Sequence, residues 1–331
     1  MLNIKTDSRK VVKGDTFIAL NGNTVDGHDF IDSAIKNGAE KIICEHGKYD
    51  VDTINVSDTH EYLKNYLVNN YSKEFENLKL IGVTGTSGKT TTCFLTYQIL
   101  NKLGIKTCYI GTIGCYIDND VVELSNTTPD ILELYNLLLT AKEKGCKVIV
   151  MEVSSHSLAE ERIKGLKFDV CAFTNLSQDH LDFHKTMEEY CKCKVKIINY
   201  LKDNGKIIVN VDDEYSKYFI CDKSLSLGIN GSNYKIKEFH MENTHTDILF
   251  NVNNDSYEVR TNLIGKFNVY NYLTSLALIN NLGISVNDII NVTDSIHAPV
   301  GRAQIVKVGT SIAVIDYAHK PDAVSKIIPL F

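Results

Sequence analysis

The chain has 331 residues, of which 44% are hydrophobic and 23% are charged, a length that suits about two globular domains. A net charge of −6 with dispersed lysines argues against a nucleic-acid-coating surface, and no apolar run approaches the ~20 residues of a membrane span. Nine cysteines lie mostly inside apolar stretches, and no secretion signal precedes them. We therefore expect a soluble, cytoplasmic monomer with reduced thiols that binds small anionic ligands, with neither a nucleic acid nor a membrane as partner.

The first part of the chain alternates short strands with a helix. "TFIALNG" from Thr16 predicts a strand, "DFIDSAIKNGA" predicts a helix that ends at Gly38, and "KIICEH" predicts a second strand. We therefore expect a small N-terminal α/β domain at residues 1–78.

Residues 79–300 predict a larger α/β domain. Apolar strand patterns separated by helical patterns indicate a mostly parallel sheet covered on both faces. The strands are expected at "KLIGV" (79–83), "KVIVMEV" (147–153), "DVCAFTN" (169–175) and "GKIIVNVDD" (205–213), and the helices at about 89–103 and from Thr186. Residues 231–262 predict an antiparallel excursion, followed by a helix that ends at Gly283. A new strand, "TSIAVIDYAH", then opens a third domain at residues 301–331.

The stretch "GVTGTSGKTTT" joins a predicted strand to a predicted helix, which is the context of a phosphate-binding loop. Its amides and the helix N-terminus would face an anion, Lys89 would reach the β and γ phosphates, and Thr90 would hold Mg²⁺. The strict spacing G-x-x-x-x-G-K-[ST] fails, because Val83 occupies the first glycine position. A Gly/Ser turn that binds no phosphate is the alternative, and the run from Lys89 to Thr92 disfavours it.

Glu152 stands at the end of the predicted strand "KVIVMEV", so it should lie near the phosphate loop and could bind Mg²⁺. A solvated carboxylate at a strand end is an equally good interpretation of this residue alone. The following Ser155 and His156 could suggest an acyl-transfer nucleophile, but the sequence has no G-x-S-x-G elbow at that point.

The segment "FTNLSQDHLDFH" follows the next strand and suits a hard cation, with His180 as a nitrogen ligand. It could equally be a polar loop with an Asx turn. Thr186 and Glu189 then form a capping box that starts a helix, on which Tyr190 and Lys194 lie one turn apart. Surface solvation is the ordinary interpretation of such a lysine. The nearby "CKC" is typical of packing residues more than of a metal site.

In combination these motifs resemble the Mur ligase family, ATP-dependent amide ligases of peptidoglycan precursor synthesis. "GTSGKTTT", "EVSSH", "TNLSQDHLDFH", "YCKCK" and "GKFNVYN" follow the family's order, and the resemblance covers about residues 6–323. The N-terminal stretch from "DSR" to "NGA" and "NTTP" at 126–129 are similar to the family's third-step members, which add an amino acid to UDP-N-acetylmuramoyl-L-alanyl-D-glutamate (UDP-MurNAc-L-Ala-D-Glu).

The resemblance implies a uridine-nucleotide domain, a central P-loop-type ATPase domain and a Rossmann-like domain for the incoming diamino acid, meso-diaminopimelate or L-lysine. It further implies that the D-glutamyl γ-carboxylate is activated by ATP as an acyl phosphate. The implied ATP contacts are Gly85, Thr86, Ser87, Gly88, Lys89, Thr90, Thr91, Asn268, Asn271, Arg302 and Asp316. The implied substrate contacts are Thr6 and Ser8 for the uridine diphosphate, and Asn126, Thr127, Thr128, Ser154, Glu160 and Arg162 for the dipeptide.

The family's chemistry also implies two Mg²⁺ ions. Thr90 and Glu152 would hold the first, and His180 and Lys194 the second, because Lys194 matches the lysine that the family carbamylates with CO₂. Lys89, Glu152, His180 and Lys194 are therefore the expected catalytic residues.

Three features depart from the family pattern. Glu160 stands where third-step members usually have Gln, and Gln304 follows "GRA" where an acidic residue is common. The sequence stops soon after "DYAHKPDAV", so we expect most of the amino-acid domain to lie outside the 331 residues. We therefore expect the 331 residues alone to form little tripeptide. The identity of the added amino acid therefore stays open at this point.

Two alternatives to a third-step ligase remain. A related amide ligase, such as a cyanophycin-synthetase-like or folylpolyglutamate-like enzyme, would act on another carboxylate, but "DSR…GDTFIAL…DGHDF" in the first domain disfavours it. A P-loop kinase or nucleotide switch would use phosphate binding without ligation and would need neither Lys194 nor His180.

Overall fold

The computed structural model describes residues 2–328 apart from 23–24, 309–310, 319–323 and 326. The chain forms two compact units. Unit 1 contains Met1–Glu76 and Ile131–Thr140, and unit 2 contains Asn77–Asp130 and Ala141–Phe331. The helix α4 (Ile131–Glu143) runs from one unit into the other. Within the described residues no helix combines the length and the apolar character that crossing a bilayer demands.

Unit 1 is built on a four-stranded parallel sheet in the order β1-β2-β3-β4. Its elements are β1 (Ile4–Lys5), β2 (Thr16–Ile18), α1 (Ile31–Lys36), β3 (Lys41–Cys44), β4 (Asp52–Asn55) and α2 (Thr59–Tyr71). Apolar side chains of β2, β3 and α1, among them Phe17, Ile31 and Ile42, form its core. The predicted strand, helix and strand are therefore confirmed.

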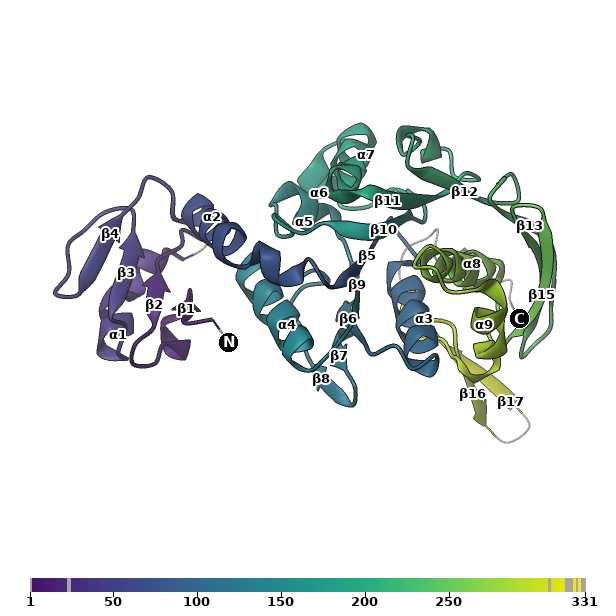
Figure 1. Cartoon of the computed structure of the whole chain (residues 1–331), viewed down its shortest axis with the longest axis horizontal. Coiled ribbons are helices and arrows are strands. Elements are labelled where there is room, and N and C mark those ends of the chain that lie inside the picture. The colour runs from purple at the N-terminus through teal and green to yellow at the C-terminus, as the bar shows by residue number, and fades with distance from the viewer. Residues whose placement is uncertain (1, 23–24, 309–310, 319–323, 326, 329–331) are drawn as a thin grey trace. The chain divides into compact units, whose positions relative to one another are not determined.

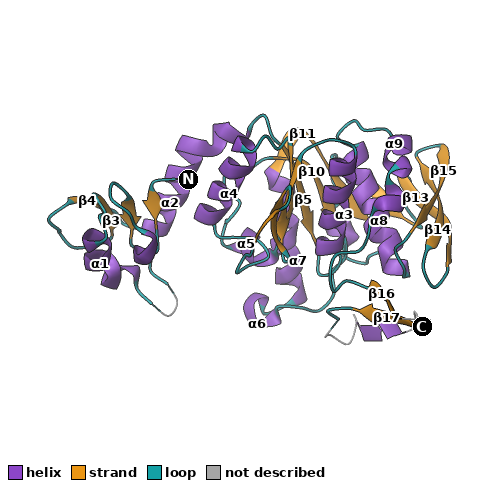
Figure 2. Ribbon diagram, turned by 90° about the horizontal axis from the view of Figure 1, so that it is seen from below, coloured by secondary structure: helices purple, strands orange, loops and turns teal. Residues whose placement is uncertain are grey.

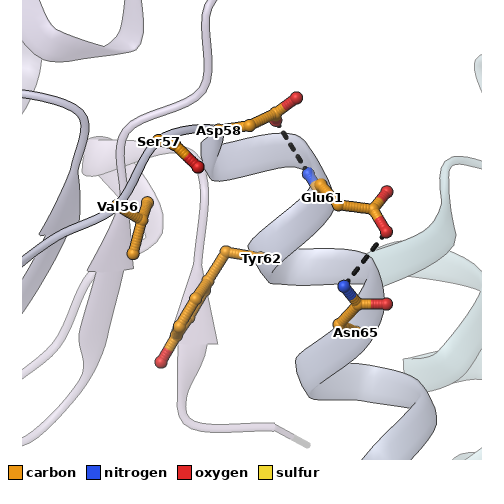
Figure 3. Close-up of a pocket in the computed structure, with 6 residues that line it drawn as sticks. All are labelled: Val56, Ser57, Asp58, Glu61, Tyr62 and Asn65. Atoms are coloured by element: carbon orange, nitrogen blue, oxygen red, sulfur yellow. Dashed lines mark hydrogen bonds between the residues drawn. The ribbon is translucent and has the colours of Figure 1, made fainter.

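A shallow surface depression of about 430 Å³ lies where β4 leads into α2 (Figure 3). Asp58 caps α2 by accepting a hydrogen bond from the backbone N–H of Glu61, and Glu61 in turn accepts one from Asn65. The lining residues, Val56, Ser57, Asp58, Glu61, Tyr62 and Asn65, include two acids and no base. The depression therefore does not suit a phosphate group.

Unit 2 contains one eleven-stranded sheet in the order β15-β14-β13-β12-β11-β10-β5-β9-β6-β7-β8. Neighbouring strands from β13 to β6 are parallel, so the predicted parallel sheet is confirmed. These strands are β5 (Lys79–Thr84), β6 (Thr107–Gly111), β9 (Val148–Glu152), β10 (Phe168–Phe173), β11 (Leu201–Asn210), β12 (Ser224–Gly228) and β13 (Tyr234–Met241). The most central of them, β5, β9 and β10, are almost entirely buried, as their apolar runs predict.

Antiparallel strands extend this sheet at both edges. β14 (Thr246–Val252) and β15 (Asp255–Thr261) confirm the predicted antiparallel excursion, which continues the main sheet through β13. β7 (Gly114–Ile117) and β8 (Asp120–Val122) pair antiparallel at the other edge. After Arg302, β16 (Gln304–Val308) pairs antiparallel with β17 (Ser311–Ile315), the strand that the sequence predicts.

Helices lie on both faces of the sheet (Figures 1 and 2). α3 (Lys89–Lys102) and α8 (Lys266–Asn280) pack against each other over one face. α5 (Ser155–Ala159) and α7 (Met187–Val195) lie on the other, near the short α6 (Leu181–His184). α9 (Val286–Asn291) follows α8. The Thr186 hydroxyl accepts the N–H of Glu189 at the start of α7, so the predicted cap is present.

Candidate active site

The turn between β5 and α3 has a backbone that requires glycine. Gly85 and Gly88 have φ angles of 145° and 86°, which side chains rarely allow. A Cβ at Gly88 would lie 2.5 Å from the amide oxygen of Asn271, and one at Gly85 would collide with the Thr174 hydroxyl. That hydroxyl donates to the carbonyl of Ser87 at 2.7 Å. The turn is therefore a tightly held loop at the N-terminus of a helix, as phosphate binding requires.

Lys89 folds back over this loop. Its ammonium group donates to the carbonyl oxygens of Gly85 at 2.9 Å and Thr86 at 2.8 Å. Loss of hydration lowers the pKa of Lys89, and the Arg302 charge lowers it further, while Glu152 and Asp179 oppose the shift. The lysine thus lies at the loop as the sequence predicts, hydrogen-bonded to backbone oxygens.

Glu152 is fully buried at the carboxyl end of β9 and borders the same loop. Its Oε2 accepts from the Thr90 hydroxyl at 3.0 Å, and its Oε1 accepts from the Tyr109 hydroxyl at 2.7 Å. Thr112 donates its N–H to Oε1 at 2.8 Å and its hydroxyl to Oε2 at 3.2 Å. The alternative of a solvated carboxylate is therefore wrong, and the predicted proximity to the loop is confirmed.

Lys194 is 1% exposed, although lysines are almost always at the surface. Its Nζ donates to the Gly85 carbonyl at 2.8 Å, the oxygen that also accepts from Lys89. The Tyr190 ring lies 4.7 Å away, and the Tyr190 hydroxyl is 3.3 Å from the Thr86 hydroxyl. Burial, and then the nearby Lys89 charge, lower the pKa of Lys194 well below its ordinary value. The surface-lysine interpretation is therefore wrong.

Three histidines pack together beside these lysines. The His156 and His180 rings meet edge to face at 4.9 Å, and His180 Nε2 lies 3.4 Å from a carboxylate oxygen of Asp179. His184 is buried, and its Nε2 has no hydrogen-bond partner. Burial, and then the charges of His156 and Lys194, lower the pKa of His184 to about 4. Across the described residues, no three His, Cys, Asp or Glu side chains alone could hold a metal ion.

The residues expected to hold the dipeptide gather next to Glu152. Thr128 is buried, and its hydroxyl donates to the Glu152 carbonyl at 2.8 Å. Arg162 donates through Nη1 to the Thr128 carbonyl at 2.8 Å and through Nε to Glu160 at 2.7 Å. The Ser154 hydroxyl caps α5, and the Thr127 and Thr112 hydroxyls lie 3.0 Å apart. Asn126 lies in the same segment, within 3.5 Å of the Ser125 hydroxyl.

Further expected contacts lie on α8 and beside β17. Asn271 packs against Gly88 and donates to the Oδ1 of Asn268 at 3.0 Å. Asp316 accepts the N–H groups of Ala303 at 2.7 Å and Ala318 at 2.6 Å, which orders the turn that carries Arg302. The buried Ser8 and its neighbour Thr6 belong to unit 1, where the Ser8 carbonyl accepts from Asn37 at 2.8 Å.

Several residues of this site were not predicted. Tyr109 and Thr112 hold Glu152, and Thr174 holds the loop. Thr112 comes directly after the carboxyl end of β6, on the same side of the sheet as the loop. This position after a strand could have identified Thr112 from the sequence. The buried Tyr109 looks in the sequence like any core aromatic residue.

The Thr90 hydroxyl and the Glu152 carboxylate are hard oxygen donors and fit Mg²⁺. An ammonium group has no lone pair for a metal, so Lys194 fits a metal only after modification.

Comparisons with known proteins show the family of the chain. The model of the "Mur ligase middle domain" matches residues 83–279, and that of the "Mur ligase family, catalytic domain" matches residues 2–74. The chain belongs to the Mur ligase family. This Mur ligase is similar to two UDP-N-acetylmuramoyl-L-alanyl-D-glutamate–2,6-diaminopimelate ligases, one from Parabacteroides distasonis at 37% identity and one from Fusobacterium nucleatum at 38%. Each alignment covers 98% of this chain and 68% of the relative.

A solved structure of a UDP-N-acetylmuramoyl-L-alanyl-D-glutamate–2,6-diaminopimelate ligase aligns with this Mur ligase at a TM-score of 0.83 and 26% identity. The alignment covers 99% of this chain and 69% of the other. The α/β architecture expected from the motifs is therefore confirmed, while the role of each site residue stays a prediction.

Proposed function

We propose that this Mur ligase adds 2,6-diaminopimelate to UDP-MurNAc-L-Ala-D-Glu at the expense of ATP, as the names of its relatives say of them. The observation that supports the proposal best is the convergence of Lys89, Glu152 and Lys194 on one glycine loop. A P-loop kinase or nucleotide switch, which binds phosphate without ligation, has no need of a buried second lysine beside the loop. We infer that the reaction takes place in the cytoplasm, where ATP is available, and that the protein acts as a monomer.

The loop and its lysine hold the triphosphate. The loop N–H groups and the N-terminus of α3 bind the phosphates, and the Lys89 ammonium turns from the Gly85 and Thr86 carbonyls to the γ-phosphate. Asn268 and Asn271 on α8, with Arg302 and Asp316, complete the ATP site. These side chains align the γ-phosphorus with the attacking carboxylate and offset the charge of two approaching anions.

The chemistry then has two steps. A γ-carboxylate oxygen of D-glutamate forms a bond to the γ-phosphorus of ATP while the bond to the β–γ bridging oxygen breaks, which gives an acyl phosphate and ADP. The neutral amine of the amino acid then attacks the acyl carbon, phosphate leaves, and the nitrogen loses a proton. Thr127, Thr128, Ser154, Glu160 and Arg162 position the dipeptide next to Glu152, and Asn126 lies in the same segment.

Two magnesium positions fit the side chains. Thr90 and Glu152 would hold one ion, and His180 would hold the other with a carbamate on Lys194. Bound magnesium neutralises charge on the phosphates. Burial and the nearby Lys89 charge favour the neutral amine of Lys194, which can add to the carbon of CO₂ and lose one proton to become the carbamate.

Unit 1 would supply the uridine diphosphate contacts through Thr6 and Ser8. This part of the proposal rests on the match of residues 2–74 to the family's first domain model and on the names of the relatives.

Calorimetry on this chain tests the choice of substrate. We expect UDP-MurNAc-L-Ala-D-Glu to bind at least tenfold more tightly than UDP-MurNAc-L-Ala, because only the former carries the D-glutamyl carboxylates, one of which we expect to pair with Arg162. Arg162→Ala should abolish that difference in affinity. Arg260→Ala is the control and should preserve the difference, because it breaks only the ion pair between Arg260 on β15 and Asp247 on β14. Equal affinity of the unmodified protein for both ligands would contradict the proposal.

A further inference from the structure

The two oxygens of the Glu152 carboxylate share Thr112 but otherwise have different partners. Oε2 accepts from the Thr90 hydroxyl at 3.0 Å and the Thr112 hydroxyl at 3.2 Å, whereas Oε1 accepts from the Tyr109 hydroxyl at 2.7 Å and the Thr112 N–H at 2.8 Å. Carboxylate torsions of Glu side chains are broad, so a carboxylate needs external contacts to fix its plane. Two donors at the end of β6 provide those contacts.

The register of β6 and β9 explains how a tyrosine reaches this carboxylate. Tyr109 pairs with Val150, and the next pair on the same face of the sheet would bring Gly111 opposite Glu152. A Cβ at Gly111 would collide with both the Glu152 Oε1 and the Tyr109 hydroxyl. The absence of a side chain at Gly111 therefore leaves the space in which the phenol of Tyr109 extends along the strand to Glu152.

Tyr109 is itself held rigidly. It is fully buried, and its ring packs edge to face against Phe94 at 5.8 Å and Tyr116 at 5.7 Å. A buried phenol needs a hydrogen-bond partner, and Glu152 is the acceptor of this one. The hydroxyl thus has a fixed place from which it can orient the carboxylate.

We propose that Tyr109 is a positioning residue that turns Glu152 so that Oε2 faces the metal held with Thr90. This inference rests on the metal-binding role proposed for Glu152 and adds a residue to which no role has been given. Partners that orient a metal ligand typically contribute a factor of about 10 to 100 to metal affinity. Tyr109 would act only through the metal, because its hydroxyl contacts the carboxylate and not the loop.

Manganese binding measured by electron paramagnetic resonance tests the proposal without turnover. Mn²⁺ is titrated into this chain with saturating AMP-PNP, and AMP-PNP affinity is measured separately in EDTA. Tyr109→Phe removes one hydroxyl and keeps the ring. Tyr97→Phe is the matched control, because Tyr97 belongs to the same aromatic cluster but donates to the Asp118 carbonyl. Glu152→Gln is the reference for loss of the ligand.

We expect Tyr109→Phe to weaken Mn²⁺ binding about tenfold and to leave metal-free AMP-PNP binding unchanged, with Tyr97→Phe within twofold of the unmodified protein. Gly111→Ala should reproduce the loss. If Glu152→Gln weakens Mn²⁺ binding but Tyr109→Phe does not, or if both tyrosine variants weaken it equally, the role of Tyr109 is refuted. If Glu152→Gln has no effect, the proposed metal role of Glu152 fails as well.

Discussion

Two carboxylates at opposite ends of the strands of one sheet show how differently one fold uses negative charge. Glu152 ends β9 at the carboxyl edge, and Asp169 lies near the start of β10 at the amino edge. Each accepts a backbone N–H from a neighbouring segment, Thr112 in one case and Leu80 in the other. Asp169 also binds two ammonium groups, those of Lys79 at 2.9 Å and Lys202 at 2.7 Å.

Glu152 has neutral donors instead, and in the described part of the chain it forms no ion pair. The two lysines nearest to the phosphate loop donate to backbone carbonyls. The negative charge of Glu152 therefore remains available to an external cation, whereas that of Asp169 is already neutralised within the protein. Ligands bind at the carboxyl ends of the strands in such sheets. We therefore expect the ion pairs of Asp169 to serve stability and the neutral hydrogen-bond donors around Glu152 to serve function.

Exchange of each carboxylate for its amide should separate these two roles. We expect Glu152→Gln to lower ATP-dependent activation of the dipeptide by about 10³-fold, because it removes charge that positions a metal at the phosphates. The thermal midpoint should change little. Activation is measured as ADP release that requires UDP-MurNAc-L-Ala-D-Glu. A variant that loses stability and activity in proportion would show that Glu152 is structural.

Lys194→Ala should lower the same activity by about 10²-fold, because no carbamate can form. A small carboxylate such as acetate should then restore part of the activity by entering the vacated space and supplying oxygen ligands. The activity of Lys194→Ala is measured against acetate concentration, with the unmodified protein as control for effects of salt. Full activity without acetate would contradict the carbamate.

Asp169→Asn should affect stability instead of activity. Loss of the charge that binds Lys79 and Lys202 is expected to lower the free energy of unfolding by about 1–3 kcal/mol at neutral pH. Burial alone would raise the pKa of Asp169, but hydrogen bonds from Lys202, Lys79 and the Leu80 N–H together hold it below the ordinary 3.8.

The sign of the pH dependence follows from that lowered pKa. The stabilisation by Asp169 is fully present above pH 3.8, and it is lost as the pH falls through the lower pKa of the folded state. The free energies of unfolding of the unmodified protein and of Asp169→Asn, measured in urea, should therefore become equal in acid. A difference that stays constant down to pH 2 would contradict the ion-pair account.

Lys192→Ala is expected to have the smallest effect. Lys192 lies on α7 two residues before Lys194, is largely exposed, and pairs with Glu188 one turn earlier. Such pairs contribute less than about 0.5 kcal/mol, so urea unfolding and dipeptide activation should both stay close to those of the unmodified protein. A large loss of activity in Lys192→Ala would mean that α7 as a whole, and not Lys194, is sensitive to substitution.

The sequence predicted those features of the fold and the site that depend on interactions between neighbouring residues. The glycines and Lys89 of the phosphate loop, the Thr186 cap and the buried parallel strands each depend on a few consecutive residues, and the structure contains all of them. The position of Glu152 followed from its place at a strand end.

What local patterns could not show depends on distant segments. By its local pattern Lys194 looks like a surface lysine, and only the family resemblance marked it as a site residue, yet its Nζ donates to the Gly85 carbonyl 109 residues away. Tyr109 reaches Glu152 across a strand pairing that no local pattern specifies. The antiparallel strands β7, β8 and β16 are short, and only their partners in the folded chain make them strands.

Trapping with hydroxylamine tests the central claim most directly, that the carboxyl edge of this sheet activates a carboxylate by phosphoryl transfer. The chain is incubated with ATP, Mg²⁺, UDP-MurNAc-L-Ala-D-Glu and hydroxylamine, which attacks an acyl phosphate without needing an amino-acid site. We predict a hydroxamate at the D-glutamyl γ-carboxyl, formed in equal amount to ADP and lost in Lys89→Ala. ADP release that does not depend on UDP-MurNAc-L-Ala-D-Glu, or a phosphorylated product that does not react with hydroxylamine, would contradict the account.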